Sequence, residues 1–254
     1  MKPDRLLQRN PSSAGATVAL LIAAHGEKHP GATNEGISRI AQDVRGRAIV
    51  SEVAVGFING IPGVADALAG LAVLDVMVYP LFAANGYFTR DRLVQLIDEA
   101  TVEGRRIEML PPLGLDPGLP DLVVGMIERT ALQNGLEPAS STAVLLAHGS
   151  RRNPASREAT ELMADKVAQR AICRDVAVAF LEEAPDLEQA MRPIEGPVIV
   201  VGMFSGDGLH GARDAPRLIA QLGRPDVVYA GVIGSAPGIA DMISRSVRGA
   251  LDRR

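Results

Sequence analysis

The sequence predicts an α/β fold made of two copies of one unit, each with a mainly parallel sheet flanked by helices. Short apolar runs rich in Val, Leu and Ile alternate with longer stretches whose apolar residues recur every three or four positions. This alternation is typical of parallel sheets covered by helices. Aromatic residues make up only 3% of the chain and Trp is absent, so the core must consist of the aliphatic residues that fill buried parallel strands.

The two copies are found by shifting the sequence against itself by 123 residues. The segments that coincide are 24–26 with 147–149, 53–62 with 176–185, and 78–91 with 201–214; after a slip of three residues, 117–123 also falls on 237–243. We therefore expect a flexible lead-in over 1–17, a first unit over 18–133, a linker over 134–140 and a second unit over 141–254. The linker is polar and contains Gly and Pro, as expected between domains.

Each unit is expected to run strand then helix four times. In the second unit the strands are predicted at 142–147, 175–181, 197–204 and 226–232, and the helices at 155–171, near 185–192, at 213–222 and at 237–250. The helix at 155–171 is the clearest, because Ala159, Met163 and Val167 recur at four-residue spacing on one face. Ligands of such sheets bind beyond the carboxyl ends of the strands, so a functional site is expected there.

The composition excludes several classes of function. A net charge of −4 without a clustered basic face gives no sign of nucleic-acid binding. The one cysteine, Cys173, cannot form an internal disulfide, which favours a reducing compartment. The apolar run at 18–24 is far shorter than a membrane span, and a matching run at 143–147 lies mid-chain, where no export signal belongs. We therefore expect a cytoplasmic protein that binds neither nucleic acid nor a membrane.

Three strand ends of the second unit carry groups suited to chemistry: His148, Glu182 and His210. Adjacent strands lie about 4.8 Å apart, so side chains from such ends can converge. Two imidazoles and a carboxylate suit a divalent metal such as Co, Fe, Ni or Zn, and they can also act as general bases. Glu183 is a rival to Glu182, but strand alternation places Glu182 on the same side as Phe180 and favours it. His29 is expected to be a surface residue.

The first unit serves as an internal control. Its residues at the positions of Glu182 and His210 are Asn59 and Tyr87, while His25 matches His148. Asn and Tyr are poor metal ligands and poor bases. We therefore expect a single active site, in the C-terminal half, with His25 on the far wall.

The order of His-Gly-Ser at 148–150, Phe-Leu-Glu at 180–182 and a Gly-rich loop with His210 resembles the class II tetrapyrrole chelatases, particularly the CbiX-type sirohydrochlorin chelatases. The resemblance spans nearly the whole chain, once per half. It implies two flavodoxin-like units that face each other across a cleft. Short members of that family dimerise, and this chain is similar to a fused dimer. The resemblance thus implies a monomer that is an internal pseudo-dimer, or a weak homo-oligomer.

The resemblance also implies an activity, which is insertion of a divalent metal into sirohydrochlorin with release of two protons, in cobalamin or sirohaem synthesis. His148 and His210 would bind the metal and take the protons, with Glu182 as the acidic partner. Co²⁺ is favoured as the metal substrate, Fe²⁺ and Ni²⁺ are alternatives, and no organic cofactor is expected. Many long members keep their histidines in the N-terminal half, whereas this chain has them in the C-terminal half, as do the anaerobic cobaltochelatases and protoporphyrin ferrochelatases.

Tetrapyrrole contacts are expected from residues near the mouth of the site: Ser150, Arg151, Arg152, Arg213 and His25, with Arg157 as a further candidate. Arginine pairs well with the carboxylates that sirohydrochlorin carries around its rim. The pair Arg213-Asp214 recurs in the first unit as Arg90-Asp91, which favours a structural role for it. Two other functions compete with this one. A non-catalytic tetrapyrrole or metal carrier stays open, while a histidine phosphatase would need an Arg directly before the His, where this chain has Ala147.

Overall fold

The computed structural model describes residues 18–26, 34–100, 102–206 and 208–254, so the expected lead-in over 1–17 and His29 lie outside the described residues. The described chain forms two four-stranded sheets in which every pairing is parallel. The first contains β1 (Val18–Ala24), β2 (Glu52–Phe57), β3 (Asp75–Pro80) and β4 (Arg106–Met109), and the second contains β5 (Thr142–Ala147), β6 (Asp175–Phe180), β7 (Val198–Gly202) and β8 (Val227–Val232). The expected α/β fold with two repeated units is confirmed.

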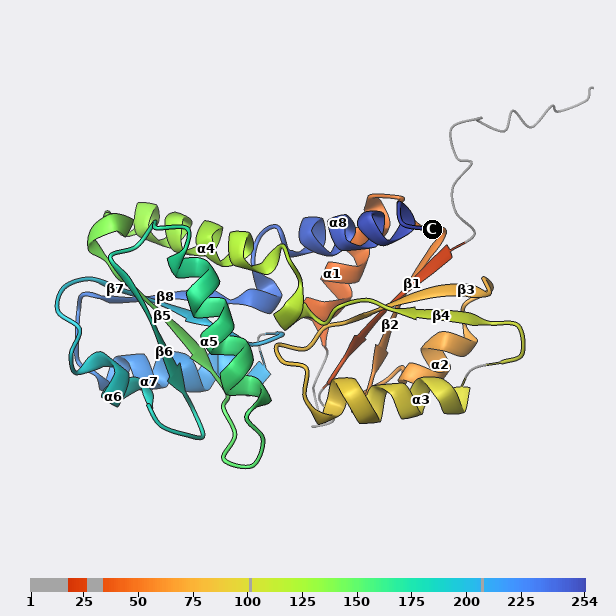
Figure 1. Cartoon of the computed structure of the whole chain (residues 1–254), viewed down its shortest axis with the longest axis horizontal. Coiled ribbons are helices and arrows are strands. Elements are labelled where there is room, and N and C mark those ends of the chain that lie inside the picture. The colour runs from red at the N-terminus through yellow and green to blue at the C-terminus, as the bar shows by residue number, and fades with distance from the viewer. Residues whose placement is uncertain (1–17, 27–33, 101, 207) are drawn as a thin grey trace, which may run out of the picture.

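Helices flank both sheets (Figure 1). They are α1 (Glu35–Gly46), α2 (Val64–Ala69), α3 (Leu93–Ala100), α4 (Leu119–Gln133), α5 (Ala155–Ala168), α6 (Leu187–Met191), α7 (Ala215–Gln221) and α8 (Ile239–Leu251). A π-helical turn precedes α3 at Phe88–Arg92, and another precedes α7 at Gly208–Asp214. The helix predicted at 213–222 therefore starts two residues later, after the second of these turns. No helix in the described residues is long and apolar enough to cross a bilayer.

The strand order positions a site in each unit. The sheets run β2-β1-β3-β4 and β6-β5-β7-β8, which is the flavodoxin-like arrangement. β1 and β5 lie inside their sheets and are buried along their whole length, which explains their uninterrupted apolar sequences. The chain leaves β1 toward β2 and then crosses to β3 on the other side. Such reversals open a crevice at the carboxyl ends of the two strands, here between β1 and β3 and between β5 and β7.

The last helix of each unit is exchanged between the units. α4 closes the first unit in sequence, yet it packs on α5, β7 and β8 of the second. α8 closes the second unit and packs on α1 of the first. In Figure 1, α4 lies over the sheet that contains β5, and α8 lies beside α1. The boundaries expected at 18–133 and 141–254 therefore describe the sequence repeat, whereas each spatial unit takes its fourth helix from the other half.

Two ion pairs on the exchanged helices follow an internal two-fold symmetry. Arg47, after α1, lies 2.7 Å from Asp241 of α8, and Arg170, after α5, lies 2.8 Å from Asp121 of α4. The arginines are related by the shift of 123 residues, and the aspartates by the same shift less the three-residue slip. Reciprocal contacts of this kind are typical of a symmetric dimer, and here both are formed within one chain. The pairs are substantially exposed and contribute little stability, so the apolar contacts beneath them must hold the helices.

Candidate active site

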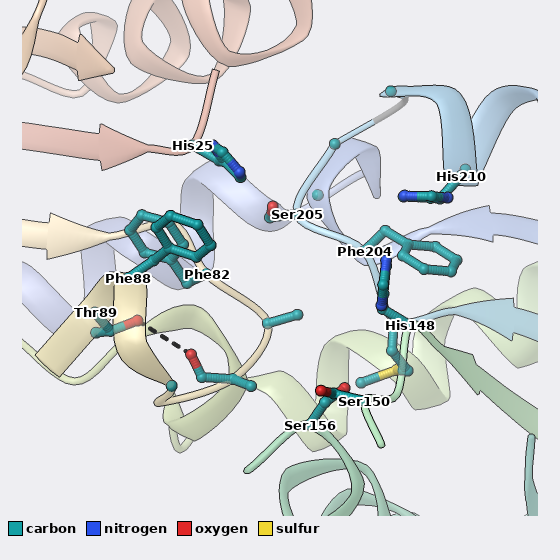
Figure 2. Close-up of a pocket in the computed structure, with 18 of the residues that line it drawn as sticks. His25, Phe82, Phe88, Thr89, His148, Ser150, Ser156, Phe204, Ser205 and His210 are labelled. Atoms are coloured by element: carbon teal, nitrogen blue, oxygen red, sulfur yellow. Dashed lines mark hydrogen bonds between the residues drawn. The ribbon is translucent and has the colours of Figure 1, made fainter. Parts of the chain in front are cut away.

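A cavity of about 1350 Å³ lies between the two units. Its walls come from the segments that follow β1 and β3 in the first unit and β5, β6 and β7 in the second. Ligand pockets commonly measure roughly 300–1000 Å³, so this cavity has room for an unusually large ligand. Figure 2 shows His25 and Phe88 on one side, with His148 and His210 on the other.

His148 is placed by a tight turn at the end of β5. Gly149 has a φ of +71°, and a Cβ there would lie 2.8 Å from Glu183 Cγ and 2.9 Å from Phe180 Cβ, so only glycine fits. The carbonyl oxygen of His148 accepts a hydrogen bond from the backbone N–H of Glu182 at 2.9 Å, which ties the end of β5 to that of β6. The Nδ1 atom of His148 lies 2.8 Å from the carbonyl oxygen of Gly149. Because a carbonyl only accepts, Nδ1 carries the proton, and in the neutral ring Nε2 keeps its lone pair.

His210 is presented by the π-helical turn Gly208–Asp214. Such turns are rare and occur frequently at functional sites. The Nδ1 atom of His210 lies 2.9 Å from Oδ2 of Asp214, a carboxylate four residues later. Nδ1 therefore donates here too, and Nε2 of the neutral ring keeps its lone pair. The rings of His210 and His148 have centroids 4.7 Å apart and planes at 86°, so the two imidazoles form a close pair.

The pair is equipped both to ligate a metal and to accept protons. A metal-binding histidine usually donates its other N–H to a carboxylate or a backbone carbonyl, and the pair has one partner of each kind. In the described ranges, however, no three His, Cys, Asp or Glu side chains lie close enough to enclose a metal ion. Glu182 lines the same cavity without joining the histidines in a ready three-ligand group. Its role as a metal ligand stays a prediction.

The two neighbouring glutamates occupy different surroundings. Glu182 is exposed and lines the cavity. Glu183 is mostly buried, accepts a hydrogen bond from the Ser150 backbone N–H at 3.0 Å and pairs with Arg157 at 2.8 Å. The Ser150 N–H, and then Arg157, hold the pKa of Glu183 below its ordinary value of 4.5. Glu183 therefore fastens the loop that carries His148, and Glu182 is the carboxylate that a ligand in the cavity meets.

We expect Glu183→Gln to lower the free energy of unfolding at pH 7 by about 1 kcal/mol, because it removes a charged partner of Arg157. The folded-state pKa of Glu183 lies below its unfolded value. Its contribution to stability is therefore complete above the unfolded pKa and is lost as the pH falls through the folded one. Denaturant unfolding of wild type and variant between pH 7 and pH 3 should give stabilities that converge at low pH. Glu182→Gln is the matched control and should leave stability unchanged. Equal stability of wild type and Glu183→Gln at pH 7 would contradict the role of Glu183 in fastening the loop.

Four of the five residues expected to contact a tetrapyrrole line the cavity: His25, Ser150, Arg151 and Arg152. Arg213 is exposed and is not among the lining residues. Arg213 belongs to the π-helical turn Gly208–Asp214, three residues beyond His210. Arg157 is not available either, because Glu183, Glu161 and the carbonyl of Ala184 hold its guanidinium, which also lies 4.5 Å from the centre of the Phe180 ring.

The two loop arginines that line the cavity, Arg151 and Arg152, differ in their surroundings. The Arg151 Nε donates to the carbonyl oxygen of Glu182 at 3.1 Å, which fixes one side of its guanidinium. The Ser150 hydroxyl accepts from the backbone N–H groups of Arg152 and Asn153 and so shapes the loop. Arg152 lines the cavity with an exposed side chain. The hydroxyl of Ser150 thus has a structural role in the loop. Its contact with a substrate stays a prediction.

His25 in the first unit has the opposite hydrogen-bonding pattern. The amide Nδ2 of Asn59, at the position of Glu182, lies 3.1 Å from His25 Nδ1. The amide N–H donates, so Nδ1 accepts and the neutral ring carries its proton on Nε2. His25 is thus a hydrogen-bond donor where His148 offers a lone pair. This difference supports the prediction of a single site in the C-terminal half.

Sequence reasoning missed Asp214 as part of the site. The signal was available, since an acidic residue four positions after a histidine lies on the same side of a helical turn. The recurrence of Arg-Asp in the first unit favoured a structural interpretation instead. There, however, the residue four positions before Asp91 is Tyr87, so the repeat conceals a partnership that exists only in the second unit.

Comparison with known proteins identifies relatives of both halves of the chain. The family model CbiX matches residues 19–130 and again residues 142–250. A probable sirohydrochlorin cobaltochelatase of Halobacterium salinarum is 23% identical over 89% of each chain. The structure of CbiX described as the terminal enzyme for biosynthesis of siroheme in denitrifying bacteria has a TM-score of 0.75 and 28% identity, and covers 91% of this chain and 98% of that one. The sirohydrochlorin chelatase SirB of Bacillus subtilis subspecies spizizenii, in complex with cobalt, shares the fold at a TM-score of 0.74 and 16% identity over 92% and 95% of the chains.

Proposed function

This chain belongs to the CbiX family and is a metal chelatase, and we propose that it inserts Co²⁺ into sirohydrochlorin with release of two protons. The observation that carries the proposal is the pair His148 and His210. Both rings have their Nδ1–H engaged, by a carbonyl and a carboxylate, and lie 4.7 Å apart on a cavity of about 1350 Å³. Two Nε2 lone pairs on one wall supply what insertion needs, which is a temporary ligand and an acceptor for protons.

The reaction exchanges protons for a metal at the centre of the macrocycle. Two pyrrole N–H groups lose their protons, and the four nitrogens then bind the divalent ion, so charge is conserved when two protons leave. The imidazoles hold the incoming ion through Nε2 and accept protons through the same atoms once the ion has moved on. Coordination by only two histidines suits transfer of the ion to the macrocycle. A complete set of protein ligands would compete with the macrocycle nitrogens for the ion.

The walls suit the rest of the substrate. Arg151 and Arg152 extend from the loop beside His148 and line the cavity, where they are placed to pair with carboxylates of the macrocycle. The volume of the cavity is suited to a ligand as large as a tetrapyrrole. Glu182 lies on the same wall and is proposed to assist the histidines with the metal.

Iron is the second candidate metal. Imidazole ligands accept Co, Fe and Ni alike, so the donor set alone does not choose among them. The Halobacterium relative is named a cobaltochelatase, which favours cobalt, whereas the CbiX of denitrifying bacteria is described as an enzyme of siroheme biosynthesis, which favours iron. The relative rates with Co²⁺ and Fe²⁺ distinguish the two.

The test gives the purified protein metal-free sirohydrochlorin with Co²⁺, Fe²⁺ or Ni²⁺ in turn and follows the absorption spectrum of the macrocycle. We expect insertion to exceed the protein-free rate with each metal accepted, and Co²⁺ to give the highest kcat/KM. A higher value with Fe²⁺ would assign the protein to sirohaem synthesis. If no metal is inserted faster than in the control, the chelatase proposal fails, and binding of the macrocycle without turnover would then indicate a carrier.

A further inference from the structure

We propose that the first unit, which lacks the histidine pair, binds one face of the macrocycle through an aromatic wall, so that metal enters from the opposite face only. The aromatic wall consists of His25, Phe82, Tyr87 and Phe88, all of which line the cavity. This inference rests on the proposed function, because it assigns the position of the substrate within that site. It gives the first unit a binding role.

Three rings of the wall, those of His25, Phe88 and Tyr87, form a connected cluster. The His25 and Phe88 ring centroids lie 4.6 Å apart at an interplanar angle of 36°, and the Tyr87 and Phe88 centroids lie 5.5 Å apart at 68°. Figure 2 shows His25, Phe82 and Phe88 together across the cavity from His148 and His210. Contacts between the rings fix their orientation before a ligand arrives.

The second unit has no such wall at the matching positions. The shift of 123 residues places Phe82 on Ser205, Tyr87 on His210 and Phe88 on Gly211. A Cβ at Gly211 would lie 2.5 Å from Val232 Cγ1, so that position is closed to a side chain. Phe204 of the second unit also lines the cavity, with its ring centroid 6.1 Å from that of His210, but it is only 8% exposed. One side of the cavity therefore exposes aromatic rings, and the facing side carries the histidine pair beside a buried Phe204. This asymmetry defines which face of a flat ligand meets which wall.

The first unit has a π-helical turn of the kind that presents His210 in the second unit. Phe88 begins a π-helical turn, Phe88–Arg92, at the place where the second unit uses the same kind of turn to present His210. π-helical turns are uncommon and occur frequently at functional sites, which suggests that this one positions something. In the first unit the turn presents Phe88 and Tyr87 instead of a histidine.

The exposure of these rings points to a flat apolar ligand. Phe88 is 39% exposed and Tyr87 is 57% exposed, although both belong to residue types that bury well. Contact with a conjugated macrocycle would remove this apolar surface from water and add ring-on-ring attraction. A tetrapyrrole held against the aromatic wall would present its other face to the Nε2 atoms of His148 and His210.

The experiment measures the binding of metal-free sirohydrochlorin, by fluorescence quenching and absorption, to wild type and to variants of Phe88. Phe88→Leu keeps apolar volume but removes the ring, and we expect it to raise Kd about fivefold. Phe88→Ala should raise Kd roughly tenfold or more, and Phe88→Tyr should stay within about twofold of wild type. Val94→Ala is the matched control, because Val94 is 38% exposed on the adjacent α3 and is not among the cavity-lining residues. Thermal unfolding of each variant checks that the fold is kept.

The outcomes separate this inference from the proposed function. If wild type binds and metallates sirohydrochlorin while Phe88→Leu and Phe88→Ala bind it as tightly as wild type, the aromatic wall is disproved and the chelatase assignment survives. If wild type neither binds nor metallates it, the proposed function itself fails. A loss of binding in Phe88→Leu that Phe88→Tyr does not share, with the KM for the metal unchanged, supports the wall. An equal loss in Val94→Ala would count against it.

Discussion

Replacing His210 by alanine should lower the rate of metal insertion by roughly two to four orders of magnitude, the range that a positioned acid or base contributes. The variant loses one of the two Nε2 lone pairs. It also removes the His210 Nδ1 atom that lies 2.9 Å from the carboxylate of Asp214. The effect should fall on kcat, because the aromatic wall and the loop arginines, which are proposed to bind the macrocycle, are unchanged. The measurement is the initial rate of the absorption change with Co²⁺ and sirohydrochlorin at saturating concentrations.

Tyr87→Ala is the matched control for this experiment, because Tyr87 occupies the position of His210 in the first unit. It should raise the KM for sirohydrochlorin through loss of a ring from the aromatic wall and leave kcat near that of wild type. Asp214→Asn should have an intermediate effect on kcat, since an amide still contacts Nδ1 but no longer fixes which nitrogen carries the proton. Equal loss of kcat in Tyr87→Ala and His210→Ala would mean that chemistry is shared between the halves.

Neither half of the chain should fold alone, because each sheet is covered by a helix from the other half. The buried residues of α4 include Leu119, Leu122, Val123, Met126 and Ile127. Burial of each contributes about 1.5–3 kcal/mol, so loss of their packing is comparable with the whole stability of a domain, roughly 5–15 kcal/mol. The first half in turn loses α8, whose Ser246 hydroxyl donates to the buried carboxylate of Asp116 at 2.6 Å.

The test divides the chain between Glu137 and Pro138 and expresses fragments 1–137 and 138–254 separately and together. Alone, each fragment should lack cooperative thermal unfolding by circular dichroism. Together they should co-elute in gel filtration as a one-to-one complex that recovers metal insertion. A fragment that unfolds cooperatively on its own, at a temperature near that of the intact chain, would show that the exchanged helix is dispensable.

Much of the fold follows from the sequence because buried parallel strands leave a plain signal. The strand expected at 142–147 is β5, and the helix expected at 155–171 is α5, three residues shorter. The repeat also points to two residues of the cavity, since His148 and His210 follow strands that flank the reversal in the sheet. Strand alternation selected Glu182 over Glu183, and Glu182 is the one that lines the cavity.

The rest depends on contacts between residues far apart in the sequence. The spacing of Leu119 and Leu122 indicates that α4 has an apolar face. The two sheets are copies of one another and offer this face similar surfaces, so the sequence does not reveal that α4 packs on the sheet of the other half. The hydrogen bonds that decide which nitrogen of His148 carries the proton involve a backbone carbonyl, which no side-chain pattern reveals. Arg213 illustrates the same limit, because it lies outside the lining of the cavity, in a π-helical turn that leaves no periodic pattern in the sequence.

The most direct measurement compares His148→Ala with His25→Ala, the twin histidines at the ends of β5 and β1. The initial rate of Co²⁺ insertion is followed with the metal and sirohydrochlorin both saturating. Removal of the His148 lone pair should reduce the rate at least about a hundredfold, whereas removal of His25, whose Nε2 carries its proton, should leave the saturated rate within about threefold of wild type and raise only the KM for the macrocycle. Equal losses in the two variants, or a larger loss in His25→Ala, would contradict a catalytic site confined to the second half.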